Sequence, residues 1–151
     1  MSCQKWLIGL ILVWIVNSLL GQLAFAHSLS ASNNYILHCS GCHGSNGTGS
    51  RTGGIPSLSL VKSFTSDAEG RTYLMQVPGI TYSGLSNKEI AAVVNYVAAR
   101  WGQPEVPFEI FTVEEVDRLR AVTIDDIVSY RRTLTKRYVA DGKLVADYPW
   151  P

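Results

Sequence analysis

Two cysteines and a histidine lie close together in the run Cys39-Ser40-Gly41-Cys42-His43. Thiols three positions apart fall on one helical turn, where each can add to a vinyl group of a haem. The imidazole that follows directly can then bind the iron from one face. The spacing therefore predicts one haem c, attached by two thioethers through Cys39 and Cys42, with His43 as the proximal iron ligand.

Three other interpretations of the motif compete with haem attachment. A redox-active pair of the thioredoxin kind would follow a β-strand, and no strand pattern precedes Cys39. A zinc site would need two further ligands, and beyond His43 the exported part of the chain offers only His27 and His38. A chance occurrence in a loop is the third. Haem is favoured because residues 1–26 have the pattern of an export leader, which directs the chain to the compartment where haem is attached.

The leader occupies the first 26 residues of the 151-residue chain. A start that contains Lys5 precedes an apolar run over 6–20, and Ala24-Phe25-Ala26 has the small-x-small pattern of a cleavage site. We expect a signal peptide at 1–26, cleaved before His27, and hence an exported, periplasmic protein. An uncleaved anchor over 6–26 remains open, and it would hold the protein at the membrane.

The charge and length of the rest of the chain limit its possible functions and domains. Of the 13 basic residues only Lys5 falls in the leader. The other 12 balance the 12 acidic residues, so the exported part is formally neutral. A neutral chain lacks the excess of basic side chains on which nucleic-acid binding depends. The composition changes after Pro104, so we expect a haem domain at 27–103 and a C-terminal helical extension at 104–151.

Hydrophobic residues recur at helical rather than alternating spacing, which predicts an all-α fold. The clearest helix starts at Ser86, which forms a capping box with Glu89, and ends before Gly102. Ser66 and Glu69 have the same spacing. We expect helices over about 33–39, 66–76 and 86–101, a glycine-rich loop over 44–56, and two short helices that start at Thr112 and Thr123.

The chain from about Asn33 to Trp101 resembles the small single-haem cytochromes c of class I. The resemblance rests on the haem motif, on Gly54-Ile55-Pro56-Ser57-Leu58 and on the closing helix that starts at Leu85-Ser86. It implies an all-α fold around one covalent haem. It also implies that the carbonyl of Pro56 accepts a hydrogen bond from the second nitrogen of His43, which would fix the tautomer of the ligand. An aromatic residue, Tyr96 or Trp101, would fill the place where the closing helix of the haem domain crosses the first helix.

The same resemblance implies a methionine as the sixth iron ligand. Met75, in Tyr73-Leu74-Met75-Gln76-Val77-Pro78-Gly79, is the one methionine after the leader. The family usually places the methionine beside the proline, and here Val77 holds that position. Met75 is also suited to fill the core. An open or water-bound site remains an alternative, and weaker candidate ligands are His27, His38, Tyr73, Tyr82 and Lys88.

Several arginines and a lysine have possible roles around a haem. Arg51 and Arg71 are candidates to neutralise the haem propionates, because a guanidinium binds carboxylates well. Arg131, Arg132, Lys136 and Arg137 would form a basic stripe on a helix. The stripe is either an ordinary solvated face or a docking surface for an acidic redox partner.

These features predict a carrier of single electrons between redox partner proteins, a donor and an acceptor, rather than an enzyme. No arrangement of nucleophile, general acid and general base is evident in the chain. One alternative is a haem protein with an open distal site that handles peroxide or a diatomic gas. Another is the haem subunit of a larger dehydrogenase or oxidase complex, with the extension as its docking element.

Overall fold

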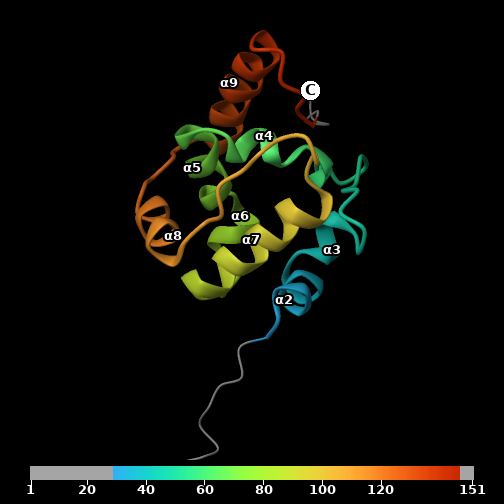
Figure 1. Ribbon diagram of the computed structural model, residues 1–151, viewed down its shortest axis with the longest axis vertical. Helices are drawn as coiled ribbons and strands as arrows, with labels where there is room; N and C mark the ends of the chain where they lie inside the picture. The colour runs from blue at the N-terminus through green and yellow to red at the C-terminus, as the bar shows by residue number, and fades with distance from the viewer. Residues whose placement is uncertain (1–28, 147–151) are drawn as a thin grey trace, which may run out of the picture.

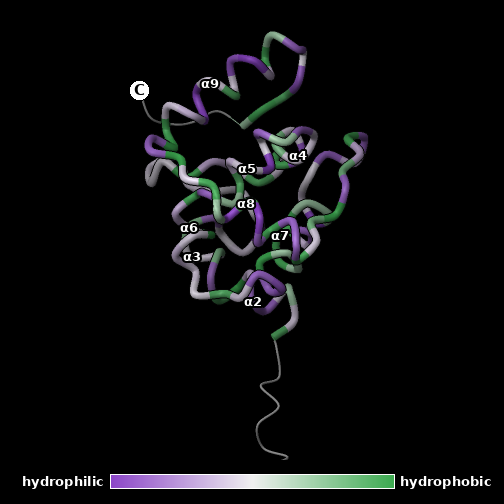
Figure 2. Tube along the Cα trace, turned by 90° about the vertical axis from the view of Figure 1, so that its left-hand side faces the viewer, coloured by the Kyte–Doolittle hydropathy of each residue, from purple (hydrophilic) through white to green (hydrophobic). Residues whose placement is uncertain are grey.

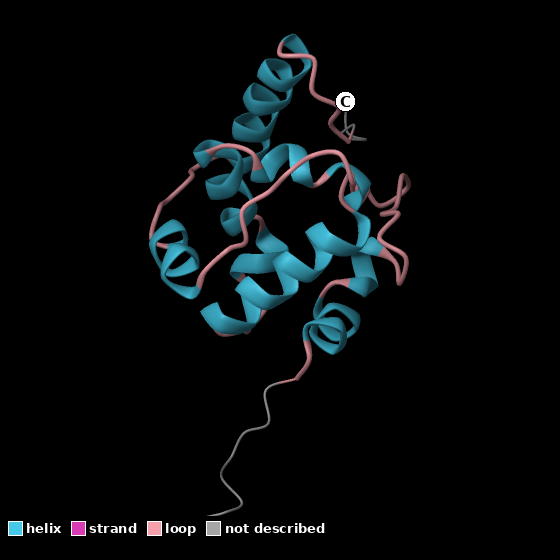
Figure 3. Ribbon diagram, viewed as in Figure 1, coloured by secondary structure: helices cyan, strands magenta, loops and turns pink. Residues whose placement is uncertain are grey.

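The computed structural model describes residues 29–146, so the predicted leader and the last five residues lie outside its scope. Within residues 29–146 every regular element is helical, as the sequence predicts, and Ser50 and Ile55 form a single isolated β-bridge (Figure 3). The elements in chain order are α2 (Ala31–His38), α3 (Ser40–His43), the 3-10 helix η2 (Leu58–Leu60), α4 (Lys62–Thr65), α5 (Ala68–Gln76), α6 (Pro78–Thr81), α7 (Asn87–Trp101), α8 (Val113–Arg120) and α9 (Ile127–Ala140). Figure 1 shows α7 running across the middle, with α2 and α9 at opposite ends of the molecule.

Helix α7 is the longest described element, and its predicted start is confirmed. The Ser86 hydroxyl accepts from the amide of Glu89, whose carboxylate accepts in turn from the amide of Ser86. Such a reciprocal cap satisfies two backbone donors that the first helical turn would leave free. The helix ends at Gly102, as predicted, and its apolar face supplies Ile90 and Val94 to the core.

Helix α2 starts two residues earlier than expected, because Ser30 caps it by accepting from the amide of Asn33. Cys39 has φ −121° and ψ −35°, which separates α2 from the single turn of α3. The segment over 44–56 is a loop, as predicted. The helix α2 packs against α7, so the chain that leads into the cysteine motif is held by the longest helix.

The predicted capping box at Ser66 is wrong. Asp67 caps α5 instead, with extended backbone and a side chain that accepts from the amide of Gly70 at 2.9 Å. Ser66 ends the preceding helix α4, and its hydroxyl donates to the carbonyl of Ser63. A carboxylate one residue further along therefore replaces the hydroxyl as the N-cap.

The extension contains two helices, as expected, but α9 has 14 residues and is not short, and its start is displaced. Thr112 caps α8 by accepting from the amide of Glu115, as predicted. The predicted start at Thr123 is wrong, because Asp126 caps α9 by accepting from the amides of Val128 and Ser129. Along α9 hydrophobic and hydrophilic residues are interspersed in the manner of a surface helix (Figure 2).

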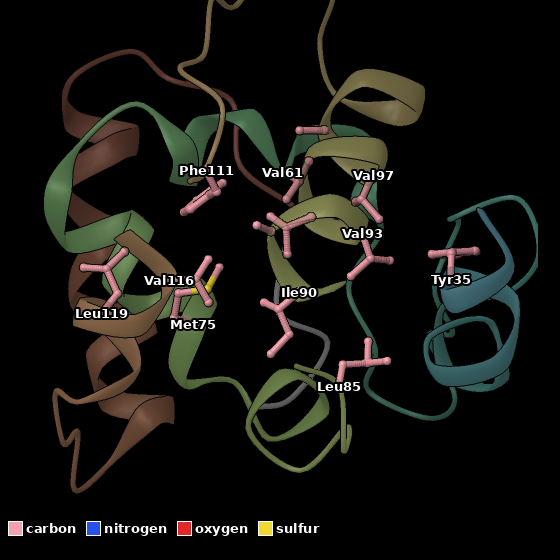
Figure 4. Packing of buried hydrophobic residues seen from close by; sticks show 13 residues of the cluster. Tyr35, Val61, Met75, Leu85, Ile90, Val93, Val97, Phe111, Val116 and Leu119 are labelled. Carbon is pink, nitrogen blue, oxygen red and sulfur yellow. The ribbon is translucent and has the colours of Figure 1, made fainter. Parts of the chain in front are cut away.

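The extension shares the main hydrophobic core. Phe111, Val116 and Leu119 are buried in one cluster with residues of α5 and α7, including Met75 and Ile90 (Figure 4). A second cluster joins α9 to α4 and α5 through Phe64, Tyr73, Leu134 and Tyr138. Among residues 29–146, no helix is long and apolar enough to cross a membrane.

Candidate functional site

The cysteine motif forms a compact turn between α2 and α3. The amides of Cys42 and His43 donate to the carbonyl of Cys39 at 3.2 and 3.0 Å, which brings the three residues together on one turn. Both thiols are free; that of Cys42 is exposed, while Cys39 lies partly buried against the core. Two thiols outside any disulfide and a neighbouring imidazole on one turn are the donor set that a covalently bound haem requires, so the residues fit the group.

His43 is oriented by the loop that follows it. Its Nδ1 lies 3.2 Å from the carbonyl oxygen of Pro56, which leaves Nε2 as the nitrogen available to a metal. Burial lowers the pKa of His43, and the contact with Pro56 only partly opposes that effect. A neutral imidazole with Nδ1–H bound to a carbonyl is the form in which histidine binds iron.

Gly49 allows the loop to bring Pro56 to the histidine. Its φ is +72°, and a Cβ at this position would collide with the carbonyl oxygens of Ile55 and Pro56. The amide of Gly49 also donates to the carbonyl of His43 at 2.9 Å. Gly49 therefore lies close to the backbone at both ends of the loop, because it donates to His43 and packs against Pro56.

Three aromatic rings support the motif where α2 meets α7. The Tyr35 ring packs on that of Trp101 at 4.5 Å and on that of Tyr96 at 6.2 Å, measured between ring centroids. Tyr35 is almost completely buried, and its hydroxyl donates to the carbonyl of Gly44 at 2.5 Å. Both candidate aromatics therefore lie at the helix crossing. Sequence analysis missed Tyr35, although its position four residues before Cys39 places it on the same helix face.

Met75 lies in the last turn of α5 and is 1% exposed. Figure 4 shows its side chain beside Val116 and Leu119 of α8, while Tyr35 lies on the other side of α7. Met75 is thus packed as a core residue, and burial of its thioether is equally compatible with the predicted role as an iron ligand.

Arg71, a candidate for binding the propionates, is occupied elsewhere. Its guanidinium donates to both carboxylate oxygens of Glu115 and to the carbonyls of Thr65 and Glu109. The expectation for Arg71 is therefore wrong, because Glu115 and Glu109 of the extension and Thr65 of α4 take up its donors. Arg51 is exposed in the glycine-rich loop, so its predicted role remains a prediction.

The weaker candidate ligands are scattered. His38 and Tyr82 are exposed, Tyr82 at 84%. Lys88 is exposed in the first turn of α7. Tyr73 is buried in the second cluster, where its hydroxyl accepts from Arg131 at 3.0 Å. His27 lies outside the described residues. In the part of the chain that the structure describes, no three His, Cys, Asp or Glu side chains form a cluster able to hold a metal ion.

The predicted basic stripe of α9 is not a continuous free surface. Arg131 is 4% exposed and lies over the Phe64 ring. Arg137 pairs with Asp67, the N-cap of α5, and with Glu69 in its first turn. Arg132 and Lys136 are exposed, whereas Arg131 and Arg137 attach α9 to α4 and to the start of α5.

Comparison with known proteins gives two curated relatives. The chain is similar to a cytochrome c-552 from a named strain of Thermus thermophilus, with 33% identity over 138 residues that cover 77% of this chain and 92% of the relative. A second cytochrome c-552 of Thermus thermophilus is 33% identical over 118 residues, covering 64% of this chain and 90% of the relative. No protein-family model matches the chain.

Proposed function

The chain belongs to the small c-type cytochromes, and from that premise we propose that it carries single electrons outside the cytoplasm on one haem c held by Cys39, Cys42 and His43. It is an electron-transfer haem protein rather than an enzyme, and it acts with redox partner proteins.

The arrangement of His43 and Pro56 carries the proposal. A haem iron supplies the change between ferric and ferrous states, and the protein has to hold its ligand rigidly through both. The contact between Nδ1 and the Pro56 carbonyl at 3.2 Å fixes the imidazole ring, and the loop that contains Gly49 fixes the carbonyl. A ligand held in this way changes little in position when the electron moves.

Intact mass and the visible spectrum of the purified protein test the attachment. We expect the mass of one haem added to the chain from which residues 1–26 have been removed. Cys39→Ala and Cys42→Ala should each leave a haem held by one thioether, which shifts the reduced α-band to longer wavelength. Ser40→Ala, within the same turn, is the matched control. A mass without haem, or with residues 1–26 retained, contradicts the corresponding part of the proposal.

Met75 is the proposed sixth ligand, since a buried thioether suits haem iron and raises its potential. The packing of Met75 against Val116 and Leu119 favours a second candidate function, a haem protein with an open distal position that binds a small ligand. Carbon monoxide added to the reduced protein separates the two. Slow or absent binding at neutral pH supports Met75, while rapid stoichiometric binding supports the open site.

A further inference from the structure

Met75 lies at a place where a helix is ordinarily loose. It is the last residue but one of α5, and the next residue after the helix, Val77, has extended backbone with φ −64° and ψ 139°. The last carbonyls of a helix lack partners within the helix, so its final turn frays readily. A methionine side chain is itself flexible. Contacts from outside α5 are therefore needed to fix the position of Met75.

Helix α8 supplies such contacts on both sides of Met75. Four residues before it, the guanidinium of Arg71 donates to both carboxylate oxygens of Glu115. One residue after it, Nε2 of Gln76 donates to the carbonyl oxygen of Leu119 at 2.8 Å. Glu115 and Leu119 are four positions apart, so they lie on one side of α8. The part of α5 that carries Met75 is thus tied to α8 at both of its ends.

The space between these two contacts is closely packed. Val116, which is completely buried, and Leu119 lie beside the side chain of Met75 in the main core (Figure 4). A densely packed interior leaves a side chain few alternative rotamers. Helix α8 therefore restrains both the backbone and the thioether of Met75.

We propose that α8 positions Met75 as the sixth ligand of the haem iron, with Gln76 and Arg71 as the positioning residues on α5. The inference rests on the proposed function, which assigns the sixth ligand to Met75. A thioether is a soft ligand that prefers ferrous iron, so in the ferric protein it stays bound only if the chain holds it in place. The contacts with α8 reduce the freedom of Met75 to leave, and they thereby keep the distal position closed.

Gln76→Leu in the haem-loaded protein tests the contact with Leu119. The substitution removes the amide donor at nearly constant volume, and the carbonyl of Leu119 keeps the amide of Val122 as a donor at 3.3 Å. Carbon monoxide binds the ferrous protein only while Met75 is displaced. We expect its association to become about fivefold faster, the effect of one lost hydrogen bond. The reduction potential should fall as well, because a thioether ligand raises it.

Thr72→Val is the matched control. Thr72 and Gln76 are both half-buried on α5, but the hydroxyl of Thr72 donates to the carbonyl of Ala68 within its own helix. The variant exchanges a polar for an apolar side chain of similar size and leaves the contacts with α8 intact. Its association with carbon monoxide should stay within about twofold of the parent protein. Gln76→Asn keeps the amide on a shorter side chain and should behave like Gln76→Leu.

Glu115→Gln removes the contact on the other side of Met75 and should also speed the binding of carbon monoxide, which keeps the test decisive if Gln76→Leu fails to fold. A purely structural role would change the free energy of unfolding alone. Unchanged association and potential in the folded variants, or an equal change in Thr72→Val, overturns the proposal. Failure of the proposed ligation by Met75 is recognised separately, because the parent protein itself then binds carbon monoxide rapidly, and that result overturns the positioning role too.

Discussion

Arg71 of α5 and Glu115 of α8 form a bidentate ion pair that joins the two helices. Nε and one terminal nitrogen of Arg71 lie 2.6 and 2.5 Å from the two carboxylate oxygens of Glu115. The guanidinium also lies 3.7 Å from the centroid of the Phe111 ring. Both side chains are largely buried, at 10% and 19% exposure, so the pair is shielded from water and salt.

Glu115→Gln should destabilise the protein by about 2 kcal/mol at neutral pH, because it leaves a largely buried guanidinium without its counter-charge. The measurement is the free energy of unfolding from chemical denaturation of the haem-loaded protein. Glu114→Gln is the matched control, since the neighbouring carboxylate is exposed on the same helix and should change stability little. Equal losses in the two variants would show that the pair with Arg71 contributes nothing specific.

The same pair predicts the direction of a pH dependence. The hydrogen bond from Arg71 lowers the pKa of Glu115 below its usual 4.5, although burial partly opposes the shift. A depressed carboxyl pKa stabilises the folded state above the unfolded value and loses that effect as the pH falls through the folded value. The stability difference between the parent protein and Glu115→Gln should therefore be constant above pH 4.5 and shrink below it. A difference that persists at low pH contradicts this assignment.

Local sequence signals predicted some helix starts and misplaced others. Ser86 with Glu89 and Thr112 with Glu115 mark their helices correctly, because in each the hydroxyl accepts from the amide three residues later. At Ser66 a stronger acceptor follows in Asp67, and at Thr123 the carboxylate of Asp126 follows three residues later. In both of those cases a carboxylate accepts the free amides of the first turn, and the hydroxyl residue falls outside the helix.

The fate of charged side chains depends on contacts that are distant in sequence. Arg71 meets Glu115 across 44 residues, and Arg137 meets Glu69 across 68. Periodicity along one helix cannot reveal such partners, so the sequence left Arg71 available to the haem propionates and Arg137 available to solvent or to a partner protein. The motif around His43 was predictable because its chemistry requires adjacent residues, whereas the contact with Pro56, 13 positions away, was expected only from the resemblance to the class I cytochromes c.

Gly49→Ala should weaken the orientation of His43. The new Cβ would push against the carbonyl of Pro56, and the hydrogen bond from Nδ1 would lengthen. An imidazole without that bond donates less strongly to iron, which favours the ferrous state, so we expect a higher reduction potential in a potentiometric titration. Gly84→Ala is the control, because Gly84 also has a positive φ, of 75°, but nothing lies within 4 Å of its added Cβ. Equal potentials in the two variants would contradict a role for Pro56.

Val116→Ala tests whether the extension belongs to the core. Val116 is completely buried beside Met75, so its truncation leaves a cavity and should cost about 2 kcal/mol of unfolding free energy. Val113, on the same helix, is 40% exposed, and Val113→Ala should change stability by less than about 0.5 kcal/mol. Similar small losses at both positions in chemical denaturation would mean that α8 is only loosely attached.

Gly70→Ala tests the close approach of α4, α5 and α9. A Cβ at Gly70 would collide with the carbonyl oxygen of Phe64 and with the hydroxyl of Tyr138. The carbonyl is backbone and cannot move aside, so α5 must shift, and we expect a loss of about 3 kcal/mol in chemical denaturation. Gly79→Ala is the control, because a Cβ there meets nothing within 4 Å, and the alanine should leave stability unchanged or raise it by about 0.5 kcal/mol. If α9 detaches in Gly70→Ala, limited proteolysis should cut between α8 and α9 faster than in the control. Unchanged stability and proteolysis in Gly70→Ala would contradict the packing of α9 on α5.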